Sequence, residues 1–499
     1  MKKLFIDYHP RRTQVALVED GELVEFQVER QDVPSIVGSI YKGKVVNLIK
    51  GMKAAFVNIG LDRNAFLYCG ESSYDRASII NKQVAECQEL KLSAGDEIMC
   101  QVVKEEFGTK GARISTNVSI PGRLIVYVPN NDYVGISRKI EEEDIRERLE
   151  KWATNAIQNI EGGVILRTAS KNATDEQLNS ELNNLIAEWK NINEEYKKAP
   201  ESTKLYEEGS LIFRMVRDLI DNDLDAIVFN DEQFANKIRG KIEQISPKPN
   251  MVEVYNGAED FFSYYGLSSQ IDKMLKRKVV LKNGAYLVID RTEALITIDV
   301  NTGKFTGEND LEQTVFETNK LAAVEIAKQL RLRNLGGIII VDFIDMVIPE
   351  HREIVVEIMK KALKKDRIKT TVVSMTGLGL LELTRKKTRS MIDTVLLKPC
   401  PYCNGSGYVY SEEQVINKIT ASLKNVINDI EPKLVLLTVN PEVFARLFTL
   451  RYLEKECSTV WKSIRIYVVP DSANHIEQFD IKTFNTMVVD LPNNAKLLY

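Results

Sequence analysis

The sequence of 499 residues is poor in cysteine and histidine and contains no long apolar run. Only two of its six cysteines, Cys400 and Cys403, are close together, which argues against a disulfide framework and for a reducing compartment. No apolar run approaches the roughly 20 residues of a membrane-spanning helix. The few apolar residues before Asp7 are too short a run for a signal peptide. We therefore expect a cytoplasmic protein with no membrane partner.

The net charge of −4 at pH 7 gives no global sign of a nucleic-acid partner. Local patches matter more, because phosphate contacts need Lys and Arg only where the nucleic-acid backbone runs. Residues 360–369 hold six basic side chains and one acid, and a second basic run follows at 385–389. Such runs are usually solvated helix faces, and a contact with RNA is the alternative.

The chain is too long for one ordinary core, so several compact units are expected. Alternating apolar residues on both sides of Asp20-Gly21 predict a β-hairpin. Short strands with glycine-rich turns from about Ser39 to Thr116 predict a small closed barrel such as an OB-fold. Residues 276–398 alternate strands and helices, with an amphipathic helix over 310–334 and another that begins at Pro349. Asn172 or Thr174 is expected to cap a helix further upstream.

Two aspartates occupy comparable places in the 276–398 unit, since Asp299 and Asp342 each end a predicted strand. Sites in α/β sheets cluster beyond the carboxyl ends of strands, and two carboxylates there can share a Mg2+ ion. Water bound to that ion can attack a phosphodiester. The alternative is that each aspartate forms a turn or caps a helix. A mechanism in which two histidines act as acid and base is less well supported, because the three histidines of the chain are widely scattered in the sequence.

Four long motifs resemble the ribonuclease E/G family, in order over essentially the whole chain: ITIDVNTGKFTG, ETNKLAAVEIAKQLRLRNLGGIIIVDFIDM, GLGLLELTRKK and CPYCNGSG. The resemblance implies an endoribonuclease that cuts single-stranded, AU-rich RNA and leaves 5′-phosphate and 3′-hydroxyl ends, in rRNA processing and mRNA decay. It places Asp299 and Asp342 on the family's Mg2+-binding aspartates and Asn301 on the asparagine that supports them. These three are the expected catalytic residues.

The resemblance also implies an α/β multidomain fold with an inserted OB-fold β-barrel. The expected order of parts is the first part of a ribonuclease-H-like subdomain (1–34), the OB-fold RNA-binding domain (35–117), a 5′-phosphate sensor region (118–209), the second part of the ribonuclease-H-like subdomain (210–275), a deoxyribonuclease-I-like catalytic subdomain (276–398), a zinc-link (399–410) and a small C-terminal α/β oligomerisation domain (411–499). The chain ends at Tyr499 without an Arg- or Pro-rich tail, so the short, ribonuclease-G-like form is expected.

Two groups of binding residues follow from the same resemblance. Phe56, Phe66 and Lys110 match the RNA-binding residues of the family's OB-fold, where a ring stacks on a base and a lysine follows the phosphates. The alternative is that both phenylalanines are core residues. The residues that match the family's sensor of a 5′-monophosphate are Gly122, Val126, Arg167 and Thr168.

One position departs from the family pattern. The best-known members carry an arginine just before their F-G-L-L-E stretch, and this chain has Gly377 there. The missing arginine puts 5′-monophosphate sensing in doubt, because a terminal phosphate is held by charge-assisted hydrogen bonds.

Cys400 and Cys403 form one CxxC, which supplies two of the four ligands of a structural zinc site. The family completes the site in a symmetric dimer, in which each subunit gives two thiolates to one Zn2+. We expect the same homodimer here, with a tetramer formed through residues 411–499 as a further step. The alternative for the two cysteines is a redox pair or ordinary thiols.

Two other functions compete with the nuclease. A non-catalytic RNA-binding or ribosome-assembly factor of the same fold predicts lost carboxylates, yet Asp299, Asn301 and Asp342 are all present. A nuclease that acts on DNA is the other, because stacking platforms accept either sugar.

Overall fold

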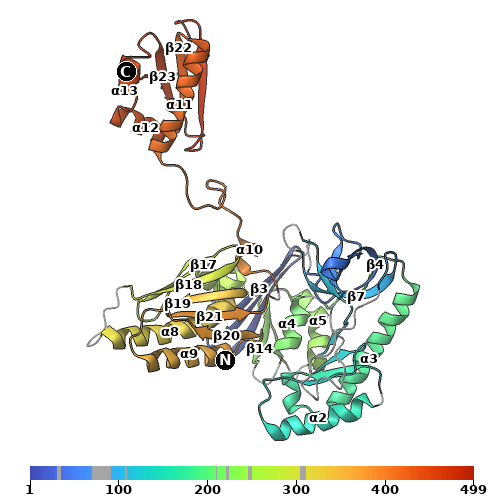
Figure 1. Ribbon diagram of the computed structural model, residues 1–499. Coiled ribbons are helices and arrows are strands. Elements are labelled where there is room, and N and C mark those ends of the chain that lie inside the picture. Colours follow the sequence, from blue (N-terminus) through green and yellow to red (C-terminus); the bar gives the residue numbers. More distant parts are fainter. Residues whose placement is uncertain are drawn as a thin grey trace. The chain divides into compact units, whose positions relative to one another are not determined.

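A computed structural model describes residues 1–30, 35–69, 92–106, 110–158, 160–209, 211–220, 224–245, 250–303, 311–387 and 389–498. The chain forms two compact units, Met1–Leu396 and Leu397–Tyr499 (Figure 1). No helix in the described ranges is long and apolar enough to cross a membrane.

The first sheet of the larger unit joins the start of the chain to residues more than 200 positions later. Strand β1 pairs antiparallel with β2 and parallel with β14, so the sheet order is β15-β14-β1-β2-β3. The predicted hairpin is confirmed, because Asp20 and Gly21 alone separate β2 from β3 and both have positive φ. The strands are β1 (Lys2–His9), β2 (Arg12–Glu19), β3 (Glu22–Arg30), β14 (Ala226–Phe229) and β15 (Val252–Val254).

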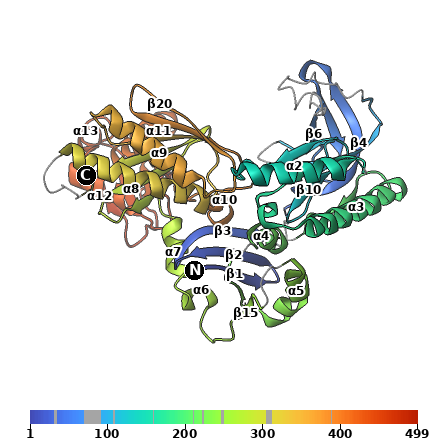
Figure 2. The same ribbon diagram turned by 90° about the horizontal axis from the view of Figure 1, so that it is seen from below.

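Helices cover both faces of this sheet. Leu4 and Ile6 of β1 pack in one cluster with α4 and α5, while Phe5 packs on the opposite face with α6 and α7, as the period of two along a strand requires. Figure 2 shows α4 and α5 to one side of strands β1 to β3 and α6 and α7 to the other. The helices are α4 (Leu211–Leu219), α5 (Glu232–Ile245), α6 (Phe261–Tyr264) and α7 (Ser268–Met274).

The predicted closed barrel is confirmed. Strands β4, β5, β6, β8 and β7 pair in that order, and pairing of β7 back to β4 closes the sheet. A closed barrel of five strands is consistent with an OB-like fold. The strands are β4 (Ile40–Ile49), β5 (Ala54–Asn58), β6 (Ala65–Tyr68), β7 (Glu97–Lys104) and β8 (Arg113–Ser115), with β13 (Thr203–Tyr206) added beside β4.

A small sheet and two helices follow the barrel. The sheet order is β11-β12-β10-β9, and the longer helix α3 is capped by Thr174 rather than Asn172. The Thr174 hydroxyl accepts from the backbone N–H of Gln177, whose side chain accepts in return from Thr174 N–H. The elements are β9 (Ile120–Pro121), β10 (Ile125–Val128), β11 (Val134–Ile136), α2 (Glu143–Ile157), β12 (Gly163–Leu166), the short 3-10 helix η2 (Thr168–Asn172) and α3 (Asp175–Lys198).

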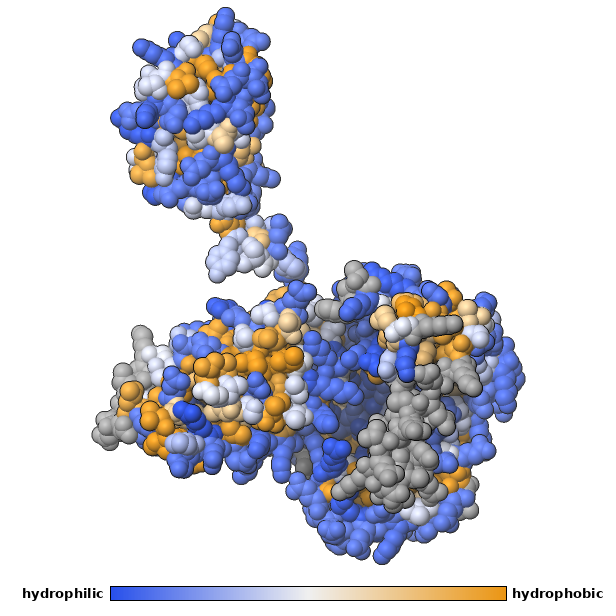
Figure 3. Space-filling model, in the orientation of Figure 1, coloured by the Kyte–Doolittle hydropathy of each residue, from blue (hydrophilic) through white to orange (hydrophobic). Residues whose placement is uncertain are grey.

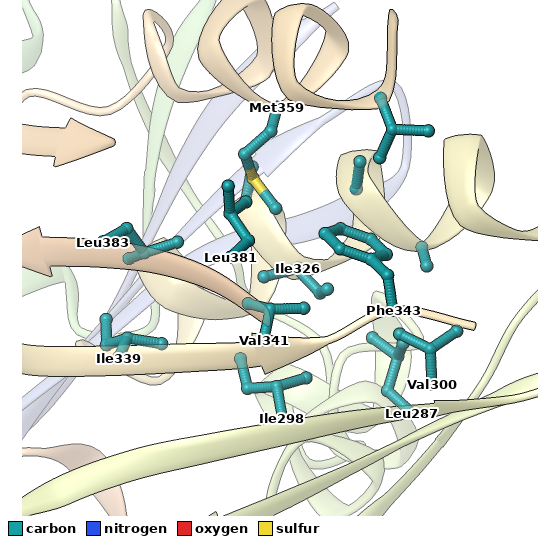
Figure 4. Close-up of a cluster of buried hydrophobic side chains, with 14 of the residues drawn as sticks. Leu287, Ile298, Val300, Ile326, Ile339, Val341, Phe343, Met359, Leu381 and Leu383 are labelled. Atoms are coloured by element: carbon teal, nitrogen blue, oxygen red, sulfur yellow. The ribbon is translucent and has the colours of Figure 1, made fainter. Parts of the chain in front are cut away.

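A six-stranded α/β sheet with order β16-β17-β18-β19-β21-β20 completes the larger unit. Both predicted helices are confirmed: α8 (Leu311–Leu332), and α9 (Pro349–Leu363) with Pro349 at its first position. They cover one face of the sheet, where alternate side chains of the strands form the core shown in Figure 4. The remaining elements are β16 (Lys278–Val280), β17 (Tyr286–Arg291), β18 (Leu295–Asn301), β19 (Gly337–Asp342), β20 (Thr370–Met375), β21 (Leu380–Arg385) and α10 (Ile392–Leu396).

The smaller unit is an α/β structure with its own core around Trp461, which is 1% exposed. Its sheet order is β24-β22-β23-β25. Its elements are α11 (Glu412–Ile430), β22 (Leu434–Val439), α12 (Pro441–Leu450), α13 (Glu454–Ser458), β23 (Arg465–Pro470), β24 (Phe479–Phe484) and β25 (Lys496–Leu497).

Candidate active site

The structure places Asp299 and Asp342 side by side. Strands β18 and β19 are parallel neighbours, and their register sets Asp299 opposite Asp342. Adjacent strands lie about 4.8 Å apart, so the two carboxylates start from neighbouring points at the carboxyl ends of the strands. The next residues, Val300 and Phe343, point into the core, and both aspartates are exposed on the sheet face that α8 and α9 leave open.

Asn301 belongs to the same face because it follows Asp299 by two residues along β18. Its side-chain Nδ2 donates a hydrogen bond to Asp299 Oδ2 at 2.7 Å. This bond fixes the orientation of the carboxylate and leaves its second oxygen for another partner. The three residues expected to be catalytic therefore lie together.

A third acid, Asp345, lies close to the pair. Partial burial and then the charges of Asp299 and Asp345 raise the pKa of Asp342. A Cβ added at Gly379, which has a φ of +81°, would lie 3.6 Å from Asp345 Oδ1, so the turn between β20 and β21 lies against this acid. Neighbouring carboxylates that repel one another are stabilised by a bound cation.

The donors that this cluster offers are carboxylate and amide oxygens. Within the described ranges, no group of three or more His, Cys, Asp or Glu side chains is arranged to hold a metal ion. Two carboxylates suffice for Mg2+, which usually keeps several waters and binds through one or two carboxylates plus substrate phosphates. The residues present therefore fit Mg2+ better than a metal that needs an all-protein cage.

Side-chain hydrogen bonds to the backbone hold the loop that carries Asp345. Asn319 of α8 is fully buried, and its side chain both donates to the Ile344 carbonyl at 2.8 Å and accepts from the Ile344 N–H at 3.2 Å. Glu312, at the start of α8, accepts from the backbone N–H groups of Val347 and Ile348. Asn319 was not predicted from the sequence, although a polar residue on the apolar side of an amphipathic helix is a visible signal.

Lys278 and Tyr286 extend the open face next to Asn301. Tyr286 of β17 pairs in register with Asn301, and the Lys278 ammonium lies 3.5 Å from the centroid of the Tyr286 ring. A cation over an aromatic face is held by the ring's quadrupole. The sequence analysis missed both residues, because only the pairing of β16, β17 and β18 brings them beside the aspartates.

Exposed apolar side chains also lie on the surface of the six-stranded sheet (Figure 3). Val280 of β16 and Ile338 of β19 are 67% and 52% exposed. Contiguous apolar surface that stays exposed usually marks a contact with another molecule.

The basic runs at 360–369 and 385–389 are exposed to solvent only in part. Arg385 is 3% exposed, and its Nε donates to Asp366 at 2.7 Å. Arg367 donates to both carboxylate oxygens of Glu25 at 2.7 Å. The helix-face interpretation is therefore wrong for these two arginines, which form ion pairs inside the fold, whereas Lys360 and Lys364 are exposed.

Phe56 and Phe66 face each other across β5 and β6. They are register partners, with ring centroids 6.1 Å apart in an edge-to-face arrangement. Both are partly exposed, while their neighbours Val57 and Leu67 are fully buried in the barrel core. The two rings therefore lie on the outside of the barrel, and Lys110 is exposed as well.

Arg167 and Gly122 of the predicted sensor contact each other. Arg167 Nη1 donates to the Gly122 carbonyl at 2.7 Å, and Nη2 donates to Asp218 Oδ1 at 2.6 Å. Thr168 shares a hydrogen bond of 2.9 Å with Ser137, and Val126 lies in β10. The guanidinium is thus already paired with Asp218, a residue that the sequence analysis missed.

Glycine is required at position 122 and not at position 377. A Cβ at Gly122 would approach Glu181 Oε1 to 2.3 Å, and this same oxygen accepts from the N–H groups of Leu124 and Ile125. Gly377 is exposed, and no atom lies within 4 Å of its added Cβ. The site of the family's missing arginine therefore has room for one.

In the smaller unit, Cys400 is exposed and Cys403 partly exposed. The chain turns tightly after them, with positive φ at Asn404, Gly405 and Gly407. Gly407 N–H donates to Cys403 Sγ at 3.4 Å, and such backbone hydrogen bonds lower the pKa of the Cys403 thiol. A lowered thiol pKa favours the thiolate, which is the form that binds metal.

Comparison with known proteins identifies the family. The model of the Ribonuclease E/G family matches residues 119–388. Ribonuclease G of Haemophilus influenzae is 40% identical over 85% of this chain and 87% of its own length. Ribonuclease G of Escherichia coli strain K12 is 38% identical over 96% of this chain and 99% of its own length. This chain belongs to the ribonuclease E/G family. The resemblance read from the motifs is confirmed.

Ribonuclease E of Escherichia coli is a more distant member, 33% identical over 83% of this chain but only 40% of its own length. The family match at 119–388 includes the aspartate pair, Asn301 and the four predicted sensor residues. The barrel and the two cysteines lie outside the matched residues. They fall within the longer alignment to ribonuclease G, which spans nearly the whole chain.

Proposed function

We propose that this protein is an endoribonuclease that uses Mg2+ to hydrolyse single-stranded RNA. The observation that carries the proposal is the register of β18 and β19, which sets Asp299 against Asp342 on an open sheet face. Membership of the ribonuclease E/G family supports RNA as the substrate class. Nothing in the site favours a non-catalytic RNA-binding factor, since the carboxylates and Asn301 are all in place.

Asp299 and Asp342 would hold the ion through one carboxylate each. When bound there, Mg2+ supplies a water of lowered pKa and neutralises charge on the phosphoryl group. Asn301 orients Asp299 through its 2.7 Å hydrogen bond. Asp345 adds negative charge that favours a cation at Asp342. Asn319 fixes the loop between Asp342 and Asp345 by binding both backbone groups of Ile344.

Lys278 is suited to contact the RNA backbone beside the reacting phosphate. Its ammonium lies over the Tyr286 ring, and that ring adjoins Asn301 in the register of the sheet. The charge is therefore held on the same face as the carboxylates. On the barrel, the partly exposed rings of Phe56 and Phe66 suit stacking on bases, and the exposed Lys110 suits a phosphate contact.

The finer parts of the proposal extend the family resemblance. We propose 5′-phosphate and 3′-hydroxyl products, a preference for AU-rich segments, and roles in rRNA processing and mRNA decay in the cytoplasm. Gly122, Val126, Arg167 and Thr168 are proposed to receive a 5′-monophosphate, with Arg167 exchanging Asp218 for the phosphate. The sheet of β1 to β3, β14 and β15 is proposed as ribonuclease-H-like, and the six-stranded sheet as deoxyribonuclease-I-like.

Cys400 and Cys403 are proposed to bind Zn2+ together with the same cysteines of a second chain. The lowered pKa of Cys403 and the exposure of Cys400 support this role. A dimer also gives the exposed apolar residues Val280 and Ile338 a partner. Pairing of dimers through residues 411–499 is the proposed route to a tetramer.

The test is cleavage of a 5′-monophosphorylated, AU-rich oligoribonucleotide with Mg2+. Asp299→Asn and Asp342→Asn are expected to lower kcat by at least about a hundredfold, because each removes a carboxylate from the proposed ion site. Asp290→Asn is the matched control, since Asp290 lies on the same sheet face but is paired with Arg277. Undiminished cleavage by Asp299→Asn or by Asp342→Asn would refute the proposal. The same oligomer made of DNA tests the choice of nucleic acid.

A further inference from the structure

A cavity of about 550 Å3 lies within the larger unit. Its walls come from β3, α4, residues 366–368 and the chain after β21. Pockets that hold small organic ligands usually enclose about 300–1,000 Å3. None of Asp299, Asn301 and Asp342 lines the cavity, so it is separate from the candidate active site.

The described lining of the cavity holds seven arginines and five carboxylates. Four of the carboxylates each hold one guanidinium at 2.6–2.8 Å. These four carboxylates are thereby neutralised and are not free to balance a further positive charge. The ion pairs are Glu25 with Arg367, Glu29 with Arg214, Asp218 with Arg167 and Asp366 with Arg385.

Three arginines of the lining remain. Arg331 is paired with Glu19 at 2.9 Å, and Arg30 also interacts with another residue. Arg389 is left without such a partner among the described residues. Its side chain makes no ion pair or hydrogen bond with any residue that the structure describes. Burial, and next the charge of Arg214, lower the pKa of Arg389, while Glu25 and Asp218 act in the opposite direction. Glu105, the fifth carboxylate of the lining, is not among the charges that act most strongly on the pKa of Arg389. An arginine nevertheless stays protonated at neutral pH, so among the described residues Arg389 is a cation without a paired carboxylate.

Two further donors at the cavity lack an acceptor. Arg214 is 5% exposed, and its Nε has no hydrogen-bond partner among the described residues. The buried Ser35 hydroxyl also has no hydrogen-bond partner among the described residues. Gln27 Oε1 is a buried acceptor to which no described group donates. A buried polar atom without a partner costs about 1–3 kcal/mol, and a ligand with matching polar atoms removes that cost. An oxyanion supplies several acceptors at once.

The walls between the charged groups are apolar. Phe26, Leu211, Met215 and Ile368 line the cavity beside the arginines. The space also exceeds what an inorganic phosphate fills. A ligand with a phosphate and a flat apolar part fits both features.

We propose that this cavity binds a small phosphorylated anion of the size of a nucleoside monophosphate, with Arg389 and Arg214 Nε donating to the phosphate. Guanidinium groups match phosphate oxygens in charge and geometry. The proposed ligand is a free nucleotide, and it is held by residues other than those proposed above for the 5′-monophosphate of an RNA. Arg167, proposed above for the 5′-monophosphate of RNA, also lines the cavity, so the test has to separate the two kinds of binding. The site does not depend on the proposed cleavage chemistry, and binding is measured without Mg2+.

The test is isothermal titration of the full chain with 5′-AMP, inorganic phosphate and adenosine. We expect saturable binding of 5′-AMP and at least about tenfold weaker binding of adenosine, which lacks the charge-assisted hydrogen bonds. Arg389→Ala is expected to weaken 5′-AMP binding at least tenfold and Arg389→Lys to weaken it less. Arg389→Ala breaks no ion pair with a described residue, so the protein should still fold. Circular dichroism and the Tm of the variant test this. Arg465→Ala, an exposed arginine of β23, is the matched control.

Absence of saturable 5′-AMP binding to the wild type overturns the proposal. Equal binding of 5′-AMP by wild type and Arg389→Ala overturns it as well, and so does displacement of 5′-AMP by a 5′-hydroxyl oligoribonucleotide. Displacement by the 5′-monophosphorylated oligomer assigns the binding to the proposed 5′-end sensor and overturns a separate nucleotide site. Failure of that oligomer to compete, with 5′-AMP still bound, supports the site for a free nucleotide.

Discussion

Removal of the Asn301 amide tests whether the orientation of Asp299 matters for catalysis. Asn301→Ala deletes the hydrogen bond of 2.7 Å to Asp299 Oδ2 and leaves the carboxylate itself in place. A hydrogen bond to a charged group contributes about 1.5–3 kcal/mol, and solvent reaches this exposed carboxylate, so the lower end applies. Since 1.36 kcal/mol is a factor of ten, kcat/KM should fall by about tenfold. The Mg2+ concentration for half-maximal rate should rise by a similar factor, as for other residues that orient a metal ligand.

The assay is cleavage of a fluorogenic oligoribonucleotide across a Mg2+ titration, with Asn301→Ala beside Asn494→Ala. Asn494 is a surface asparagine of the smaller unit, where its side chain donates to the Pro470 carbonyl. Thermal unfolding should change little in either variant, because surface substitutions usually stay within about 0.5 kcal/mol. The reasoning is refuted if Asn301→Ala keeps the wild-type rate and Mg2+ dependence while Asp299→Asn is inactive. In that case Asn301 does not position the carboxylate.

Three further predictions concern the ion site, the sensor and the cysteines. Partial burial and then the charges of Asp299 and Asp345 raise the pKa of Asp342, so Mg2+ affinity should decline on acidification at a higher pH than an ordinary aspartate allows. Asp345→Asn should move this decline to lower pH, and titrations with Mg2+ at several pH values measure it. Gly377→Arg, at an open and exposed position, should increase the rate ratio of 5′-monophosphorylated to 5′-hydroxyl substrate by about tenfold, because the new arginine can donate charge-assisted hydrogen bonds to the phosphate. An unchanged ratio speaks against a sensor near this turn. Cys403→Ser or a zinc chelator should convert a dimer to monomers in sedimentation, and a dimer that persists without zinc counts against the shared thiolates.

The raised pKa of Asp342 also makes folding stability depend on pH. A carboxyl whose pKa is raised in the folded protein binds its proton more tightly there than in the unfolded chain. Its contribution to stability is therefore favourable at low pH and is lost as the pH rises through the raised pKa. Without Mg2+, Asp342→Asn should gain stability relative to wild type as the pH rises through this range. Urea unfolding at two pH values measures the difference. Asp290→Asn should change in the opposite direction, because Arg277 lowers the pKa of Asp290 and its loss costs stability as the pH rises.

Local signals in the sequence predicted local structure well. The dipeptide Asp20-Gly21 forms its hairpin because both residues accept positive φ. Thr174 caps α3 with Gln177 three residues later, and Pro349 opens α9. The meeting of Asp299 and Asp342 was also predictable, because both end strands of one α/β unit and parallel strands present their carboxyl ends at the same edge.

The residues that the sequence did not reveal depend on pairings between distant segments. Asp218 holds Arg167 from 51 positions away, and Asn319 reaches Ile344 from a neighbouring helix. Lys278 reaches the site only through the order of three antiparallel strands. The basic run around Arg367 misled because spacing along the chain does not show that the other partner, Glu25, lies in the first sheet.

The central claim is that Asp299 and Asp342 share one divalent cation. Isothermal titration of the full chain with Mn2+, as a substitute for Mg2+, tests it. The zinc content of the protein is first measured and made equal in all variants. The account predicts a site in the wild type that is lost in both Asp299→Asn and Asp342→Asn and kept in Asp290→Asn. Retention of the wild-type stoichiometry and affinity in either of the first two variants would contradict it.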